Sequence, residues 1–243
     1  MKFTRPVRAV LFDMDGTLYG QELLRLFMVL ELASLPVALG SLKAASRVWQ
    51  VLRVFRQTRE ELRAFGASIE CLDSFQYEEA ANRLGADPTF IRRAVAEWMF
   101  HRPLRYLPLC RRYGSTVFFD WLRECHFPVG VFSDYPARAK LQALGLSGRV
   151  WPVLCATDPE INAFKPHPSG FLRACEIWGL APDEVLYVGD RQETDAVGAA
   201  AAGMPNVIVS RIAWMKAHQD FKNHINIASF EELQHVLIHN IER

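Results

Sequence analysis

The chain has 243 residues, half of them hydrophobic, which is enough for one large domain or for a core with an insert. A net charge of +1 and a pI near 7.7 give no reason to expect a nucleic acid partner. Five cysteines without CxxC or Cys/His metal spacing are typical of buried thiols in a reducing compartment. The first apolar segment begins close to the N-terminus and leaves no room for a signal peptide, so we expect a cytoplasmic protein.

Residues 7–12 form a short apolar run that predicts a buried strand, and two carboxylates follow it. Residues two apart on a strand point to the same side, so Asp13 and Asp15 can face a common point. Their repulsion raises the pKa of one of them, and it is unfavourable unless a cation lies between them or one keeps its proton. Either arrangement suits a metal-bound nucleophile beside a general acid/base, although the fragment alone also fits an ordinary Asp/Gly turn.

The region from about residue 18 to residue 112 is predicted to be helical. The expected helices are 22–39, 41–63, 75–84 and 88–100. The first is strongly apolar, but Arg25, Glu31 and Pro36 interrupt it before an uncharged stretch reaches the roughly 18 residues of a membrane span. We therefore expect a buried helix, or two helices separated near Pro36. Residues 41–63 carry apolar side chains at the spacing of one helix face.

Strands and helices alternate in the remainder of the chain. The expected strands are 128–132, 151–155, 184–188 and 206–209, and the expected helices are 115–125, 136–144, 168–178, 194–202 and 230–241. This pattern predicts an α/β fold in which helices cover both faces of a doubly wound parallel sheet. Ligands of such sheets bind at the carboxyl ends of the strands.

Polar residues follow several of these predicted strands. Ser133 and Asp134 come after 128–132, and Lys165 precedes helix 168–178. Asp190 comes after 184–188, with Asp195 five residues further on. Each has an ordinary structural explanation when taken alone, as a helix cap or a solvated loop charge. Their order along the chain, each at one edge of the predicted sheet, favours a common site.

The ordered set resembles the four motifs of the haloacid dehalogenase superfamily. The matching residues are Asp13-Met14-Asp15-Gly16-Thr17, Ser133, Lys165, and Gly189-Asp190 through Asp195. The resemblance implies a Rossmann-like core of residues 1–18 and 112–243 and a helical cap of residues 19–111. The cap is similar in kind to that of the phosphoglycolate phosphatase and β-phosphoglucomutase branch. Tyr19 and Gln21 border the cap and are expected to line its entrance.

The resemblance also implies a phosphoaspartyl mechanism. Asp13 would attack phosphorus, and Asp15 would protonate the leaving oxygen and later take a proton from water. Ser133, Asp134 and Lys165 would bind the substrate phosphate. Because phosphoryl transfer depends mainly on positioning and charge neutralisation, the Lys165 ammonium and the Ser133 hydroxyl suit that task.

Mg²⁺ is the cofactor that the resemblance implies, since it prefers oxygen ligands and substrate phosphates. We assign it the Asp13 carboxylate, the Asp15 backbone carbonyl and Asp190. Asp195 would not bind the ion itself but would orient Lys165 or a metal-bound water. The alternative for Asp195 is a cap of the helix at 194.

The leading interpretation is a Mg²⁺-dependent phosphatase that hydrolyses a phosphomonoester of a small metabolite. A phosphomutase is the alternative within the same superfamily. Asp15 argues against carbon–halogen cleavage, because dehalogenases of this group lack an acid there. Asp15 also argues against a non-enzymatic binding module, because ligand binding alone does not need it.

The apolar segment 23–39 stands beside a basic helix that carries Trp49, Arg53, Arg56 and Arg63. This combination leaves open a phosphatase that acts on a lipid or prenyl phosphate at a membrane surface. The simpler explanations are a large cap core or a dimer interface, and we expect a monomer or a homodimer. His167 and the other histidines are expected to be structural, and Arg191 to contact a neighbouring carboxylate or the substrate.

Overall fold

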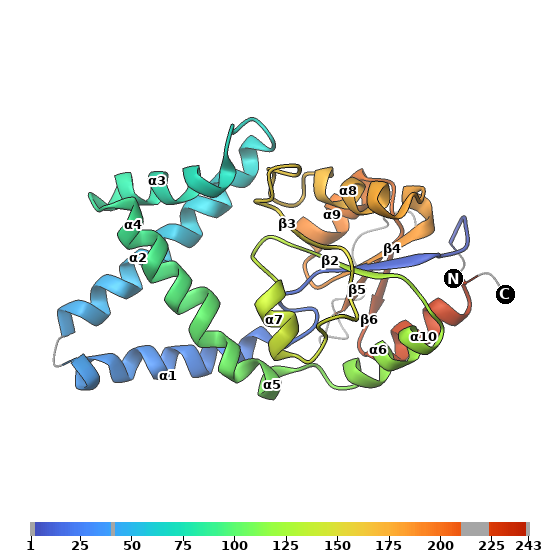
Figure 1. Cartoon of the computed structure of the whole chain (residues 1–243), viewed down its shortest axis with the longest axis horizontal. Helices are drawn as coiled ribbons and strands as arrows, with labels where there is room; N and C mark the ends of the chain where they lie inside the picture. The colour runs from blue at the N-terminus through green and yellow to red at the C-terminus, as the bar shows by residue number, and fades with distance from the viewer. Residues whose placement is uncertain (1–2, 40–41, 210–223, 242–243) are drawn as a thin grey trace.

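The computed structural model describes residues 3–39, 42–209 and 224–241. The described residues contain a six-stranded sheet in the order β3-β2-β1-β4-β5-β6, in which every neighbouring pair is parallel. The strands are β1 (Ala9–Phe12), β2 (Val129–Ser133), β3 (Val153–Cys155), β4 (Val185–Gly189), β5 (Asn206–Val209) and β6 (His224–Ile227). The predicted doubly wound α/β fold is confirmed (Figure 1).

Strand β6 was not predicted from the sequence. The strand has only four residues, His-Ile-Asn-Ile, and most of them are half-buried. It therefore lacks the continuous apolar run of the central strands. It pairs with β5 at the edge of the sheet. The other strands differ from the expected ranges only at their ends.

Helices cover both faces of the sheet because successive strand residues point to opposite sides. Val10 and Phe12 of β1 pack in one apolar cluster with Phe118 of α6 (Ser115–Glu124) and Phe230 of α10 (Phe230–Ile238). Leu11 lies in the opposite cluster, which includes residues of α8 (Ser169–Trp178) and α9 (Val197–Ala201). Helix α7 (Arg138–Ala143) follows β2 and lies on the side of α6, and α9 continues a short π-helical turn, Gln192–Ala196.

The described residues between β1 and α6 form a helical insert beyond the carboxyl end of β1 (Figure 1). Its helices are α1 (Gln21–Leu39), α2 (Leu42–Leu62), α3 (Leu72–Leu84), α4 (Pro88–Val95) and α5 (Leu107–Cys110). A short 3₁₀ turn, Arg63–Phe65, follows α2, and a π-helical and a 3₁₀ turn, Ala96–His101 and Arg102–Tyr106, join α4 to α5. A third apolar cluster around Phe55, Tyr77 and Trp98 holds the insert together. The exact division of the chain at residues 18 and 112 stays a prediction.

Helix α1 departs from the expectation of a buried helix or a pair separated near Pro36. It is one helix through Leu39, and within residues 21–34 it buries Leu24 and Leu32 on one side. Leu26 and Leu30 are 53% and 58% exposed on the other side. Among the described residues, no helix combines the length and the apolar character that crossing a membrane requires. The predicted helix start at Ser41 and the expected structural role of His218 lie outside the described residues.

Candidate functional site

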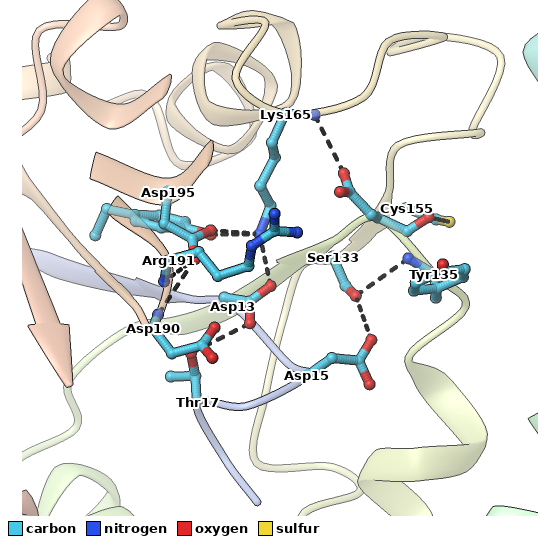
Figure 2. A network of polar contacts seen from close by, with 12 residues as sticks. Asp13, Asp15, Thr17, Ser133, Tyr135, Cys155, Lys165, Asp190, Arg191 and Asp195 are labelled. Atoms are coloured by element: carbon cyan, nitrogen blue, oxygen red, sulfur yellow. Dashed lines mark hydrogen bonds and ion pairs between the residues drawn. The ribbon is translucent and has the colours of Figure 1, made fainter. Parts of the chain in front are cut away.

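Asp13 lies directly after β1, where its backbone N–H donates to Val188 O of β4 at 2.8 Å. The side chain is buried, and its Oδ2 accepts from Thr17 Oγ1 at 3.2 Å while Oδ1 accepts from Lys165 Nζ at 2.6 Å (Figure 2). Burial raises the pKa of Asp13 well above its usual range, and the Lys165 ammonium opposes this. Nearby carboxylates raise that pKa further, which makes a second cation favourable here.

Lys165 reaches this point from the loop before α8. Its Nζ contacts three oxygen atoms, those of Asp13 Oδ1 and Tyr187 OH at 2.6 Å and Asp195 Oδ1 at 2.9 Å. Burial lowers the pKa of Lys165, but the charges of Asp13 and Asp195 outweigh it and raise the pKa overall. Lys165 is therefore a buried ammonium whose three protons each have an acceptor.

Asp195 uses both carboxylate oxygens for contacts within the protein. Oδ1 accepts from Lys165 Nζ and from Tyr187 OH, the latter also at 2.9 Å. Oδ2 accepts the backbone N–H groups of Asp190 and Arg191 at 3.2 and 3.0 Å (Figure 2). Asp195 is thus placed to hold Lys165 and the loop after β4 in position.

Asp190, in contrast, offers a free oxygen. Its Oδ1 is buried without a hydrogen-bond partner among the described residues. Burial, followed by the charge of Asp195, raises the pKa of Asp190 to about 7. Gly16 makes room for this carboxylate, because a Cβ at Gly16 would lie 2.0 Å from Asp190 Oδ2.

This donor set fits an oxygen-preferring divalent cation. One carboxylate oxygen from each of Asp13, Asp190 and Asp195 lies within 4.8 Å of the others. Because Asp195 is already saturated, Asp13 and Asp190 are the carboxylates that remain for a metal ion. The Asp15 carbonyl accepts from Gln21 Nε2 at 2.6 Å and keeps a second lone pair.

The Asp15 carboxylate lies among three donors, of which the sequence did not reveal Lys140. Its Oδ1 accepts from Lys140 Nζ at 2.5 Å and from the Tyr19 hydroxyl. Its Oδ2 lies 3.5 Å from Ser133 Oγ, which also accepts from Tyr135 N at 3.2 Å (Figure 2). Lys140 is buried on α7. The sequence does not show which face of this short helix turns inward, so Lys140 could not be distinguished there from a solvated surface charge.

The predicted role of Asp134 in binding the substrate phosphate does not hold for its carboxylate, which is already paired within the protein. It accepts from Arg63 Nη1 at 2.6 Å and from the Lys165 backbone N–H at 3.1 Å. Burial raises the pKa of Asp134, but the positive charges of Arg63 and Lys165 outweigh it and lower the pKa. The side chain is therefore an anion without a proton to donate to a phosphate.

The same contact changes the interpretation of the basic helix face. Arg63 does not face solvent but joins the insert to the core, since it also donates to Lys165 O at 2.7 Å. Arg59, which the sequence analysis did not single out, is buried, donates to Asp134 O at 2.6 Å and lies over the Tyr135 ring. Arg53 and Arg56 are both exposed, and Arg56 also lines a cavity between the core and the insert.

A cavity of about 870 Å³ lies between the core and the insert. Asp13, Asp15, Ser133, Lys165 and Asp190 all line it, so the structure brings the predicted residues to one place. Tyr19 and Gln21 line it too, at its edge with the insert, as expected. Arg191 also borders the cavity, with Nη1 3.8 Å from Glu60 Oε1. The His167 ring contacts Ser169 Oγ at 2.8 Å, which fits a structural role.

Comparison with known proteins agrees with this geometry. A family model described as haloacid dehalogenase-like hydrolase matches residues 7–203. A glyceraldehyde 3-phosphate phosphatase from Methanopyrus kandleri is 29% identical over 210 residues, 84% of each chain. A phosphoglycolate phosphatase from Xanthomonas campestris is 28% identical over 206 residues, 82% of this chain and 81% of the relative. A 2-haloacid dehalogenase from Pseudomonas syringae shares the fold, with a TM-score of 0.65 over 96% of this chain and 98% of its own, at 20% identity.

Proposed function

Because the chain belongs to the haloacid dehalogenase-like hydrolase family and is a phosphoric monoester hydrolase, we propose that it acts through a phosphoaspartate on Asp13 with Mg²⁺ as cofactor. The substrate is a phosphomonoester of a small metabolite. The observation that carries the proposal is the contact of a buried Lys165 ammonium with Asp13 Oδ1, in a cavity that Asp15 and Asp190 also line. The cytoplasmic location and the monomeric or homodimeric state stay predictions.

In the first step, an oxygen of Asp13 attacks phosphorus and the bond to the leaving oxygen breaks. The leaving oxygen takes its proton from the Asp15 carboxyl group, so an alcohol departs and an acyl phosphate remains on Asp13. Lys165 and Thr17 fix the Asp13 carboxylate for this attack. Ser133 Oγ and the Asp134 backbone N–H are the donors assigned to the phosphoryl oxygens.

In the second step, water adds its oxygen to phosphorus and gives a proton to the Asp15 carboxylate. The bond between phosphorus and Asp13 breaks, which releases inorganic phosphate and restores both carboxyl groups. Lys140 Nζ contacts Asp15 Oδ1 and holds the Asp15 carboxylate in position for this step. Asp15 has no comparable task in halide release, so its presence supports phosphate chemistry.

Mg²⁺ would be held by the carboxylates of Asp13 and Asp190 and by the Asp15 backbone carbonyl. When bound there, it neutralises charge on the phosphoryl group and on the crowded carboxylates. Asp190 Oδ1, which is buried and has no hydrogen-bond partner in the part of the chain that the structure describes, supports this assignment. Asp195 then serves to position Lys165 and the backbone of the β4 loop.

Release of phosphate from p-nitrophenyl phosphate in the presence of Mg²⁺ tests the proposal. We expect Asp13→Asn, and removal of the metal with EDTA, to abolish turnover. Glu124→Gln, on the exposed side of α6, is the matched control and keeps full activity. Undiminished turnover by Asp13→Asn contradicts the proposal, and a sugar 1-phosphate that is isomerised without release of free phosphate indicates a phosphomutase instead.

A further inference from the structure

The insert gives the cavity an extensive apolar wall. This wall is formed by the side chains of Leu24, Met28, Leu32, Leu52, Trp98 and Phe100. Those on α1 and α2 are held by the apolar clusters of the protein, so the wall is a packed surface rather than loose chain. At about 870 Å³, the cavity lies near the upper end of the roughly 300–1,000 Å³ that suits drug-sized ligands. A two-carbon phosphate ester would leave most of this wall in contact with water.

Most cations around the cavity are already engaged by the protein. Arg25 donates to Gln21 Oε1, Arg63 pairs with Asp134, and Lys140 pairs with Asp15. Arg56 is the cavity-lining arginine of α2 that has no carboxylate partner among the described residues. A second anionic group on the substrate, as in phosphoglycolate, would therefore have to be met by Arg56, or by Arg25 in exchange for its contact with the neutral Gln21 amide.

The apolar wall continues to the outside of the protein. Val29 of α1 and Trp49 of α2 both line the cavity, yet they are 45% and 48% exposed. Large apolar side chains at the rim of a pocket are typical of sites that remove an apolar ligand from water. An alkyl chain that starts at the carboxylates can follow this wall to the exposed rim at Val29 and Trp49.

We propose that the insert selects a phosphomonoester of an apolar aliphatic alcohol, such as an alkyl or prenyl monophosphate. This inference rests on the proposed phosphatase function and adds the substrate class to it. The phosphate lies at Asp13, Ser133 and Lys165, and the chain lies against α1, α2 and the turn after α4. Each methylene that leaves water for this wall strengthens binding, independently of the chemistry at phosphorus.

The test is a series of unbranched alkyl monophosphates from ethyl to decyl, each below its critical micelle concentration. Geranyl phosphate, phosphoglycolate and glyceraldehyde 3-phosphate complete the panel. We expect kcat/KM to rise by about fourfold per fully buried methylene, and by less once the chain passes the rim. Geranyl phosphate should be hydrolysed far better than either short, polar substrate.

The double variant Val29→Asn/Trp49→Asn removes the apolar rim. We expect it to lower the ratio of kcat/KM for decyl over ethyl phosphate at least about tenfold. Leu30→Asn is the control, because Leu30 is 58% exposed on the same helix but does not line the cavity. Leu30→Asn should keep the wild-type ratio of kcat/KM for decyl over ethyl phosphate. That result would show that the loss in the double variant does not come from lower surface hydrophobicity in general.

Failure of the inference differs from failure of the proposed function. The inference is wrong if kcat/KM is flat or falls with chain length and phosphoglycolate is the preferred substrate. If Arg56→Gln also abolishes that preference, the enzyme is a phosphatase of anionic metabolites. If no phosphomonoester in the panel, p-nitrophenyl phosphate included, releases phosphate in the presence of Mg²⁺, the proposed function itself is wrong. The wild-type series decides the matter even if the double variant does not fold.

Discussion

Lys165 Nζ lies 2.6 Å from Asp13 Oδ1, although the two residues are 152 positions apart in the sequence. Both side chains are buried, and Asp195 Oδ1 lies 2.9 Å from the same ammonium. A buried ammonium between two carboxylates balances charge that burial would otherwise make unfavourable. The pair therefore links the stability of the core to Asp13, the proposed nucleophile.

Replacing Lys165 with Met should destabilise the protein. The change leaves Asp13 and Asp195 buried without their counter-ion, and breaking a buried pair in this way costs about 3–5 kcal/mol. Urea unfolding in EDTA measures the free energy of unfolding. Lys43→Met, at an exposed position of α2, should change it by no more than about 0.5 kcal/mol. The double variant Lys165→Met/Asp195→Asn should recover part of the lost free energy of unfolding. If Lys165→Met alone loses less than about 1 kcal/mol, the contact of Lys165 with Asp13 is not needed for stability.

Replacing Gly16 with Ala should weaken Mg²⁺ binding. The new Cβ would lie 2.0 Å from Asp190 Oδ2, so the carboxylate must move. We expect the Mg²⁺ concentration for half-maximal activity to rise about 10- to 100-fold. Gly85→Ala is the matched control, since Gly85 also has a positive φ but its added Cβ meets nothing within 4 Å. An equal Mg²⁺ requirement in both variants would mean that Asp190 does not hold the ion.

Replacing Asp15 with Asn should separate the two chemical steps. p-Nitrophenolate is a good leaving group and departs with little need of an acid, but hydrolysis of the acyl phosphate still needs a base. Stopped-flow experiments should show a burst of p-nitrophenolate equivalent to the enzyme, followed by turnover that is about 10²–10⁴-fold slower than in the wild type. Steady turnover at the wild-type rate would remove Asp15 from the mechanism.

The ion pair of Asp134 with Arg63 predicts a dependence of stability on pH. Because the folded protein lowers the pKa of Asp134, the stabilisation is complete above the unfolded value of about 3.9 and is lost as the pH falls through the lower, folded value. The difference in free energy of unfolding between the wild type and Asp134→Asn should therefore be constant from about pH 7 to pH 5 and shrink below about pH 4. Urea unfolding across this range measures it. A difference that stays the same down to about pH 3 would rule out an ionised Asp134 as its source.

The sequence was informative where side-chain chemistry and strand position coincide. In β1, alternate burial of Val10 and Leu11 on opposite faces follows from the strand period, and the polar residues at strand ends converge because all described neighbouring strands are parallel. These features need no knowledge of how distant elements pack.

The rest depended on how the insert lies against the core. Lys140, Arg59 and Arg63 stand on or beside helices, where a sequence pattern cannot distinguish a solvated charge from one that turns inward. Their partners, Asp15 and Asp134, lie far away in the chain, so only the tertiary structure pairs them. For the same reason the sequence could not show that the carboxylate of Asp134, predicted to bind phosphate, is paired with Arg63.

The central claim is that Asp13 carries the phosphoryl group during turnover. The most direct measurement is an acid quench of a single turnover with a phosphate-labelled substrate, followed by peptide mapping of the labelled protein. The account predicts label on the peptide that contains Asp13, an increase of that label in Asp15→Asn, and none in Asp13→Asn. Turnover that proceeds with no label on Asp13, even in the Asp15→Asn variant, would contradict it.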